Sequence, residues 1–197
     1  MKQNPFCINP IACNPKAILE DSIRITGFAD FATITVDVNE DIAAVMVDCV
    51  QIQRVFMNLM INALQAMPPS PHVARVQIRA RNVTLAAEQV PPLSGGDYVE
   101  FEVRDNGSGI KPEHVAKVFD PFFTTKKHAV GLGLDIVRSV VRAHGGQVGL
   151  HTETGKGTAV VVYLSRVGPF VAADLNKQGA SESFRPERRP WRSTILS

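Results

Sequence analysis

Residues 98–110 read YVEFEVRDNGSGI, a segment in which an alternating strand ends on an acidic residue and continues into two closely spaced glycines. The alternation of apolar and polar residues is typical of a strand with one buried face. Glycine weakens a strand, so Gly107 and Gly109 directly after Asp105 indicate a backbone that another group approaches closely. The segment therefore predicts a strand that delivers a carboxylate to a binding loop.

The composition is that of an ordinary globular protein. The 197 residues are 45% hydrophobic and 20% charged, enough for one domain and a short extension. Net charge is +2 and its basic excess lies in residues 165–197, so the main body offers no basic face for nucleic acid. No apolar run has the length of a membrane span, and the N-terminus lacks the residue order of a signal peptide.

The three cysteines predict neither a disulfide framework nor a zinc site. Cys7, Cys13 and Cys49 are odd in number and contain no Cys-x-x-Cys pair. A reducing cytoplasm is therefore the expected location.

Hydrophobic periodicity and capping residues predict the regular elements. Asn14-Pro15 begins a helix, and Asp48 with Gln51 begins a longer one that Pro68-Pro69 ends. A third helix is expected at 132–144, and strands are expected at 32–38, 43–48, 73–85, 98–105, 147–153 and 157–164. Residues 106–130 show no sustained period beyond a short turn near 111–119, which predicts a long functional loop.

This order of elements predicts an α+β fold. The simplest packing is a two-layer sandwich, with the helices on one face of a mainly antiparallel sheet. We divide the chain into an N-terminal segment (1–14), one domain (15–165) and a tail (166–197). The tail is rich in Ser, Arg and Pro, so we expect it to be poorly ordered, as a linker or as a binding segment.

The long helix carries two asparagines beside its apolar stripe. The stripe that should face the sheet consists of Val55, Phe56, Leu59, Ala63 and Ala66. Asn58 and Asn62 are four residues apart and share a face. Two helical asparagines on their own are more often solvated than ligands, but beside glycine loops they favour a ligand. An amide oxygen suits Mg2+, which accepts few protein ligands beside nucleotide phosphates.

The loop residues predict nucleotide chemistry. An ionised carboxylate at Asp105 only accepts hydrogen bonds, so it would bind the exocyclic amine of adenine and repel the carbonyl of guanine. The alternative is that Asp105 caps a turn, as a lone Asp-x-Gly usually does. Gly131 and Gly133 precede and enter a helix, where free amides and the helix dipole favour phosphate.

Five segments in this order resemble the ATP-binding catalytic domain of sensor histidine kinases. NLMINALQAM (58–67) is similar to the N box and DNGSGI (105–110) to the G1 box. VFDPFFTTK (118–126) is similar to the F box, GLGLDIV (131–137) with the following HGG to the G2 box, and GKGTAVVVYL (155–164) to the closing hairpin. The resemblance covers roughly residues 15–165. It implies the Bergerat fold of the GHKL superfamily, which includes gyrase, the ninety-kilodalton heat-shock chaperones and MutL, with ATP and Mg2+ as ligands.

The resemblance also implies roles for individual residues. Asn62 would coordinate Mg2+, Asn58 would support the phosphates or the metal shell, and Asp105 would read adenine. The other residues that it implies in nucleotide binding are Gly107, Gly109, Ile110, Phe119, Phe123, Lys126, Gly131, Leu132, Gly133, Leu134 and Thr158.

A mobile lid is implied between the F box and the G2 box. Phe119, Phe122 and Phe123 would anchor it, and Gly131 and Gly133 would form its far end. Lys126, Lys127 and His128 would meet phosphates or form a solvated basic loop. The sequence departs from the family pattern at Ala129 and Val130, where a glycine is common, and at Gln65, where some relatives have a phosphate-contacting lysine.

The residue at position 58 bears on the reaction. Superfamily members that hydrolyse ATP have a glutamate there, whereas Asn58 cannot act as a base. The resemblance therefore implies phosphoryl transfer to a histidine on a dimerisation domain that we expect this chain to lack, and from there to a response regulator. No histidine here has the His-Glu-x-x-x-Pro setting of the family's acceptor. A hydrolytic ATPase and a nucleotide-sensing module without transfer activity are the alternatives.

Overall fold

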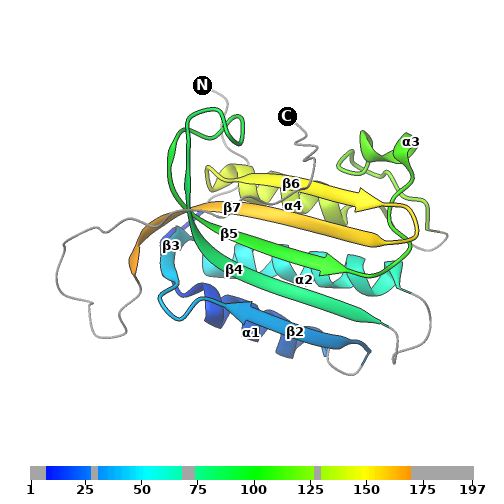
Figure 1. Ribbon diagram of the computed structural model, residues 1–197, viewed down its shortest axis with the longest axis horizontal. Coiled ribbons are helices and arrows are strands. Elements are labelled where there is room, and N and C mark those ends of the chain that lie inside the picture. The colour runs from blue at the N-terminus through cyan, green and yellow to red at the C-terminus, as the bar shows by residue number, and fades with distance from the viewer. Residues whose placement is uncertain (1–7, 28–30, 68–73, 127–129, 170–197) are drawn as a thin grey trace.

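The computed structural model describes residues 8–27, 31–67, 74–126 and 130–169, which fold into one sheet and its covering helices (Figure 1). In chain order the elements are β1 (Ile11–Cys13), α1 (Pro15–Thr26), β2 (Thr33–Val38), β3 (Ala43–Val47), α2 (Cys49–Ala66), β4 (Arg75–Leu85), β5 (Gly96–Asp105), α3 (Pro112–Val115), α4 (Gly133–Ala143), β6 (Gln147–Glu153) and β7 (Gly157–Pro169).

The sheet has seven strands, six of which follow the order β1-β3-β7-β5-β4-β2. The seventh, β6, pairs with Gly157 to Tyr163 of β7 on the edge opposite β5. Every pair is antiparallel except β2 with β4. Helices α1, α2 and α4 lie together on one face of the sheet, as Figure 1 shows. The prediction of a two-layer α+β sandwich is thus confirmed.

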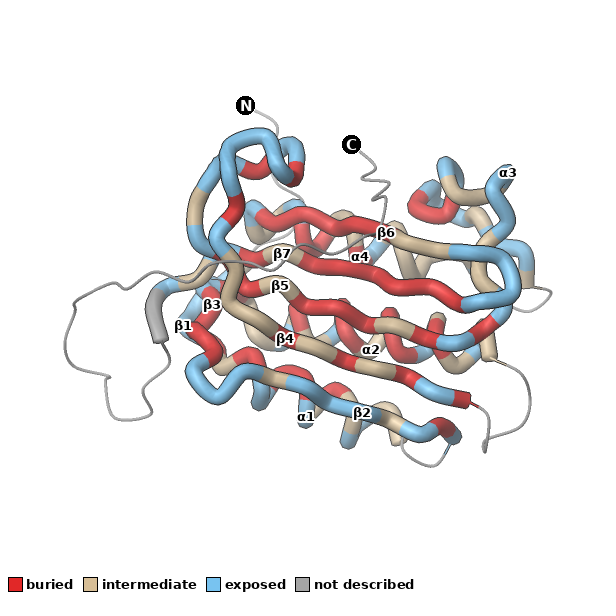
Figure 2. Tube along the Cα trace, in the orientation of Figure 1, coloured by how far each residue is buried: buried red, intermediate tan, exposed pale blue. Residues whose placement is uncertain are grey.

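The core lies between the two layers because alternate strand residues point toward the helices. On β5 these are Val99, Phe101 and Val103, all buried. The ring of Phe101 packs on Phe56 of α2, with 4.9 Å between ring centroids. Figure 2 shows the buried residues running along the central strands and the facing side of α2. Burial of these large side chains holds α2 firmly against β5.

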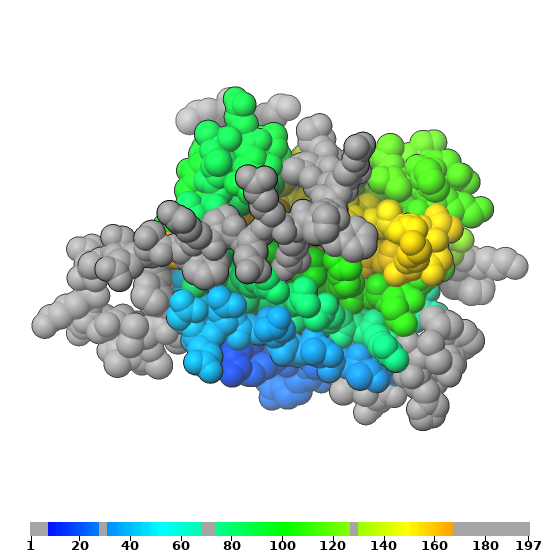
Figure 3. Space-filling model, in the orientation of Figure 1, coloured from blue at the N-terminus to red at the C-terminus, as the bar shows by residue number. Residues whose placement is uncertain are grey.

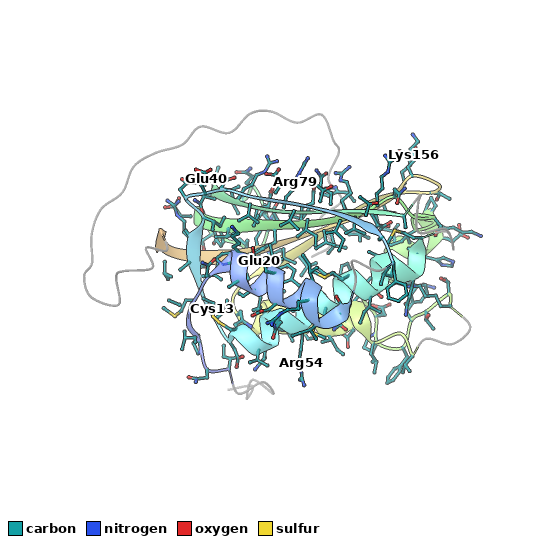
Figure 4. The ribbon with its side chains drawn as sticks, turned by 90° about the horizontal axis from the view of Figure 1, so that it is seen from below. Cys13, Glu20, Glu40, Arg54, Arg79 and Lys156 are labelled. Carbon is teal, nitrogen blue, oxygen red and sulfur yellow. A yellow bond between two sulfur atoms is a disulfide. The ribbon has the colours of Figure 1, made fainter. Side chains whose placement is uncertain are left out.

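Charged side chains occupy the opposite face of the sheet. Arg79 on β4 lies 3.5 Å from Asp37 of β2 and 3.8 Å from Glu102 of β5. Figure 4 shows Arg79 on the side of the sheet away from the helices. The alternation that predicts the strands therefore also separates core from solvent.

Two of the three predicted helix starts are confirmed by their side-chain caps. The Asn14 side chain accepts the Lys16 N–H at 2.9 Å, and the Asp48 side chain accepts the Gln51 N–H at 3.1 Å. At the other end of α2, the carbonyl of Ala66 accepts the Ser108 N–H at 2.9 Å. The loop after β5 is thereby fixed to the C-terminal end of α2, one turn beyond Asn62.

The cysteine prediction is wrong, because Cys13 and Cys49 are joined by a disulfide with 6.1 Å between their Cα atoms. The short strand β1 pairs with β3, which brings Cys13 beside the start of α2. The sequence did not predict β1, which has three residues and lies in the expected N-terminal segment. The cysteine argument for a reducing compartment therefore no longer holds; Cys7 lies outside the described residues.

Strand β7 is longer than expected. It continues past Leu164 to Pro169, and Arg166 pairs with Val45 of β3. The expectation that regular structure ends near residue 165 is therefore wrong for residues 166–169, because these residues add a strand partner for β3. The rest of the predicted tail lies outside the described residues. None of the described helices combines the length and apolar character needed to cross a membrane.

Candidate functional site

Asp105 ends β5 with its carboxylate buried, only 9% of the residue being exposed. Its Oδ1 accepts two main-chain N–H groups, from Gly107 at 2.8 Å and from Thr158 of β7 at 3.2 Å. No donor from the described residues reaches the second oxygen, Oδ2. Burial raises the pKa of this carboxyl above its usual value, although the two N–H groups and the charge of Lys126 oppose the shift.

The glycine turn after Asp105 is closely packed on both sides. A Cβ added to Gly107 would lie 2.5 Å from the Ala66 carbonyl oxygen of α2. Gly109 has a φ of +65°, and a Cβ there would collide with the carbonyl of Glu153 at the end of β6. The predicted need for glycine at these two positions thus has a steric cause, since each backbone touches another backbone.

Thr152 of β6 links the turn to β7, and the sequence did not predict it. Its hydroxyl accepts the Ile110 N–H at 2.9 Å and lies 3.1 Å from both the Thr158 hydroxyl and the Gly157 carbonyl. The hydroxyl therefore holds together two residues predicted to take part in nucleotide binding, Ile110 and Thr158. Nothing in the alternation of β6 distinguishes Thr152 from an ordinary strand residue.

Asn58 and Asn62 lie on one face of α2, each half-buried. The Nδ2 of Asn62 is buried and has no hydrogen-bond partner within the described part of the chain. A Cβ added to Gly133 would lie 3.2 Å from this nitrogen and 3.4 Å from Oδ1. The start of α4 thus approaches the Asn62 amide closely, and an unpaired buried amide has hydrogen-bonding capacity left for a ligand.

The predicted phosphate-binding glycines begin α4. Leu132 is the N-cap residue and makes no side-chain cap, although its carbonyl accepts the Ile136 N–H at 3.0 Å. Gly131 has a φ of +76°, and a Cβ there would lie 2.6 Å from the Phe122 carbonyl carbon and from the Phe123 carbonyl oxygen. Leu134 packs against the core. The first amides of α4 are therefore left without a side-chain acceptor from the N-cap, as expected at an anion site.

The three phenylalanines of the F box differ in burial. Phe119 is buried in the core, and Phe123 is partly buried with its ring centroid 5.5 Å from that of His114. Phe122 is 71% exposed, so the expectation that it anchors the loop is wrong. Its φ of +65° lies in the left-handed region, which a residue other than glycine seldom adopts.

Arg138 of α4 fixes the F box, and the sequence did not predict this role. Its Nη2 donates to the Phe119 carbonyl at 2.8 Å, and its guanidinium lies 5.5 Å from the centroid of the Phe119 ring. A single side chain on α4 therefore holds both the backbone and the ring of Phe119.

Lys126 lies beside α2 rather than in solvent. Its Nζ donates to the Gln65 Oε1 at 2.9 Å, and the residue is half-buried. Burial lowers the pKa of the Lys126 ammonium, and the charge of Asp105 opposes that shift. Lys127, His128 and Ala129, to which the sequence also gave roles, lie outside the described residues.

These parts meet at one end of the molecule. In Figure 3 the segment around α3 lies beside the turn between β6 and β7, at the end where β5 delivers Asp105. Figure 4 shows Cys13 at the opposite end from Lys156, which lies in that turn. Within residues 8–27, 31–67, 74–126 and 130–169, no group of three His, Cys, Asp or Glu side chains would hold a metal ion.

The fold and this site define an ATPase-type nucleotide-binding domain. Residues 47–167 match the family described as histidine kinase-, DNA gyrase B- and HSP90-like ATPases, and the chain belongs to this family. Within it, the predicted resemblance to the catalytic domain of sensor histidine kinases is confirmed.

The matched relatives are sensor kinases. The chain is 36% identical over 154 residues to the sensor kinase CckA of Brucella abortus, a match that covers 76% of this chain and 16% of the relative. It is 40% identical over 113 residues to the sensor protein FixL of Bradyrhizobium diazoefficiens, covering 57% and 20%. The chain thus spans only a sixth to a fifth of the length of these two relatives.

Two solved structures have the same fold. The mycobacterial sensor histidine kinase MprB superposes with a TM-score of 0.62 at 25% identity, covering 83% of this chain and 99% of that one. Full-length ShkA in complex with AMPPNP superposes with a TM-score of 0.64 at 20% identity, covering 83% of this chain and 33% of that one.

Proposed function

We propose that this domain binds Mg-ATP and transfers the γ-phosphoryl group to a histidine on a separate dimerisation domain. The observation that carries the proposal is the buried Asp105 carboxylate. Two main-chain N–H groups fix it through one oxygen, while no donor from the described segments reaches the other oxygen. A carboxylate held in this way accepts hydrogen bonds and offers none, which matches the amine of adenine. Gly107, Gly109, Ile110 and Thr158 would bind the same nucleotide beside this acid.

Asn62 is the protein ligand that we propose for Mg2+. The nitrogen of its buried amide has no hydrogen-bond partner in the part of the chain that the structure describes, and its oxygen is a neutral hard donor. Bound Mg2+ would supply neutralisation of phosphate charge. Asn58, one turn earlier on α2, would donate to the phosphates, and the first amides of α4 after Leu132 and Gly133 would bind them.

Transfer is favoured over hydrolysis because position 58 holds an amide. A hydrolase needs a base that activates water, and an asparagine side chain does not take up a proton. An imidazole acceptor has its own lone pair and needs no such base. The remaining contribution of the protein is positioning and charge neutralisation, which are the main needs of phosphoryl transfer.

The partners follow from this reaction. The acceptor would be a histidine-bearing helical domain of the same or another chain, and the phosphoryl group would pass from it to a response regulator. ShkA, a relative in fold, was solved with the ATP analogue AMPPNP. The reaction needs a supply of ATP, which the cytoplasm provides. This need supports a cytoplasmic location, whereas the cysteines do not.

The test is transfer of label from γ-labelled ATP. We expect an acid-labile, base-stable phosphoimidazole on a cognate histidine domain when this chain and Mg2+ are present, with slow steady hydrolysis when the acceptor is left out. Rapid hydrolysis without acceptor that is lost in Asn58→Ala would instead favour a hydrolytic ATPase. Saturable nucleotide binding without any transfer would favour a sensing module.

A further inference from the structure

The contact between Gln65 and Lys126 joins two positions 61 residues apart at the edge of the site. The Lys126 ammonium donates to the Gln65 amide oxygen at 2.9 Å. Gln65 lies in the last turn of α2 and is exposed, whereas Lys126 is half-buried in the loop before α4. Holding the end of the half-buried Lys126 orders a long side chain and lowers its conformational entropy. A favourable interaction must offset this cost.

Gln65 continues the polar face of α2. Asn58, Asn62 and Gln65 are spaced by four and three residues, so they succeed one another along one side of the helix. The Lys126 ammonium is therefore held one turn beyond Asn62. It also lies near enough to Asp105 for each charge to influence the other. The ammonium is thus held by the last turn of α2 and interacts electrostatically with the base-reading acid.

The chemistry of the holding group matters. An amide oxygen accepts one proton of the ammonium but does not neutralise its charge, and two of the three donors stay available. A carboxylate at position 65 would form an ion pair and cancel the charge. Among the described residues Asp105 takes part in no ion pair, although it is the acid that acts on Lys126. Without an acceptor at position 65, this acid is the group toward which Lys126 would be drawn.

We propose that Gln65 is a positioning residue that keeps the Lys126 ammonium on α2, away from Asp105, so that the cation binds the polyphosphate of a nucleotide. The proposal rests on the proposed function and deepens it. An ion pair between Asp105 and Lys126 would occupy both side chains. Holding them apart leaves Asp105 available for the base and Lys126 available for phosphate. Preference for nucleotides over nucleosides at this site would then depend on position 65.

The first experiment is calorimetric titration of the whole chain with Mg-ATP, Mg-ADP and adenosine. Gln65→Glu should weaken ATP about tenfold, the scale of one hydrogen-bonded charge contact, and leave adenosine unchanged. Gln65→Leu should weaken both ligands, because Lys126 then pairs with Asp105. Gln53→Glu is the matched control, since it makes the same charge change on the same helix about 18 Å away and should change neither ligand.

The second experiment exchanges the two side chains. Lys126→Gln alone should weaken ATP about tenfold, and the double variant Gln65→Lys with Lys126→Gln should restore most of that loss because the pair is rebuilt in reverse. A purely structural role would not produce recovery. Equal ATP affinity in Gln65→Glu and wild type, or no recovery in the double variant, would overturn the inference while adenosine still binds. If wild type binds neither ATP nor adenosine, the proposed function itself fails.

Discussion

Replacing Asp105 with asparagine tests the base-reading role most directly. The change keeps the size of the side chain and keeps an oxygen that accepts the N–H groups of Gly107 and Thr158. It replaces the open carboxylate oxygen by an NH2 group, which would face the adenine amine donor to donor. Loss of one charge-assisted hydrogen bond should weaken ATP by about 1 to 3 kcal/mol. This corresponds to a factor of about 5 to 150 in Kd.

The same substitution should stabilise the protein without nucleotide. Burial raises the pKa of Asp105 in the folded state above its ordinary value of 3.8. The folded state thus binds this proton more tightly than the unfolded state does, so the stability contributed by Asp105 is complete below pH 3.8 and is lost as pH rises through the raised pKa. At neutral pH the ionised group is a cost, and Asp105→Asn should raise the melting temperature.

The assay combines thermal melting with calorimetric titration of ATP and GTP. Asp97→Asn is the matched control, because Asp97 lies at the other end of β5 and bonds Thr84 and Arg166 at the surface. It should lower the melting temperature slightly and leave ATP affinity unchanged. ATP binding by wild type should also weaken as pH falls through the Asp105 pKa. An Asp105→Asn variant that keeps its ATP affinity and its preference over GTP would refute the role.

Three further substitutions test the other parts of the site. Asn62→Ala should reduce Mg-dependent ATP affinity about tenfold while adenosine affinity stays constant, as titration with and without Mg2+ would show; equal losses would indicate misfolding. Gly131→Ala forces a Cβ against the backbone of Phe122 and Phe123 at positive φ. It should reduce the free energies of unfolding and of ATP binding by about 1 to 3 kcal/mol each, measured by thermal melting and titration. Arg138→Leu removes the bond to the Phe119 carbonyl and should cost about 1 to 3 kcal/mol in thermal unfolding, with partial recovery in Arg138→Lys; unchanged melting would exclude the anchoring role.

Local patterns predicted most of the fold. The caps Asn14 and Asp48 mark their helix starts because a side-chain oxygen at the N-cap is a local requirement. The strand β1 was missed because three residues are too few to show an alternation. The disulfide between Cys13 and Cys49 was missed for the same reason, since it depends on the pairing of β1 with β3.

The site likewise combines features that adjacent residues predict with features that depend on contacts between distant segments. Asp105, Gly107 and Gly109 are adjacent in sequence, so their backbone requirement is visible there. Contacts between segments that are distant in sequence are not visible there. The roles of Thr152 and Arg138 therefore appear only in the folded structure. Gln65 had been noted only as a departure from the family pattern, and its partner is found 61 residues away.

Because main-chain N–H groups hold the Asp105 carboxylate, its orientation does not depend on the side chain at position 158. Neither donor depends on a side chain, so any residue except proline at position 158 supplies the N–H that β7 offers to the acid. The orientation of the carboxylate is therefore fixed once β5 and β7 pair in their native register during folding. The conformational entropy lost on ordering the Asp105 side chain is thus part of folding, and it does not reduce the affinity for a base.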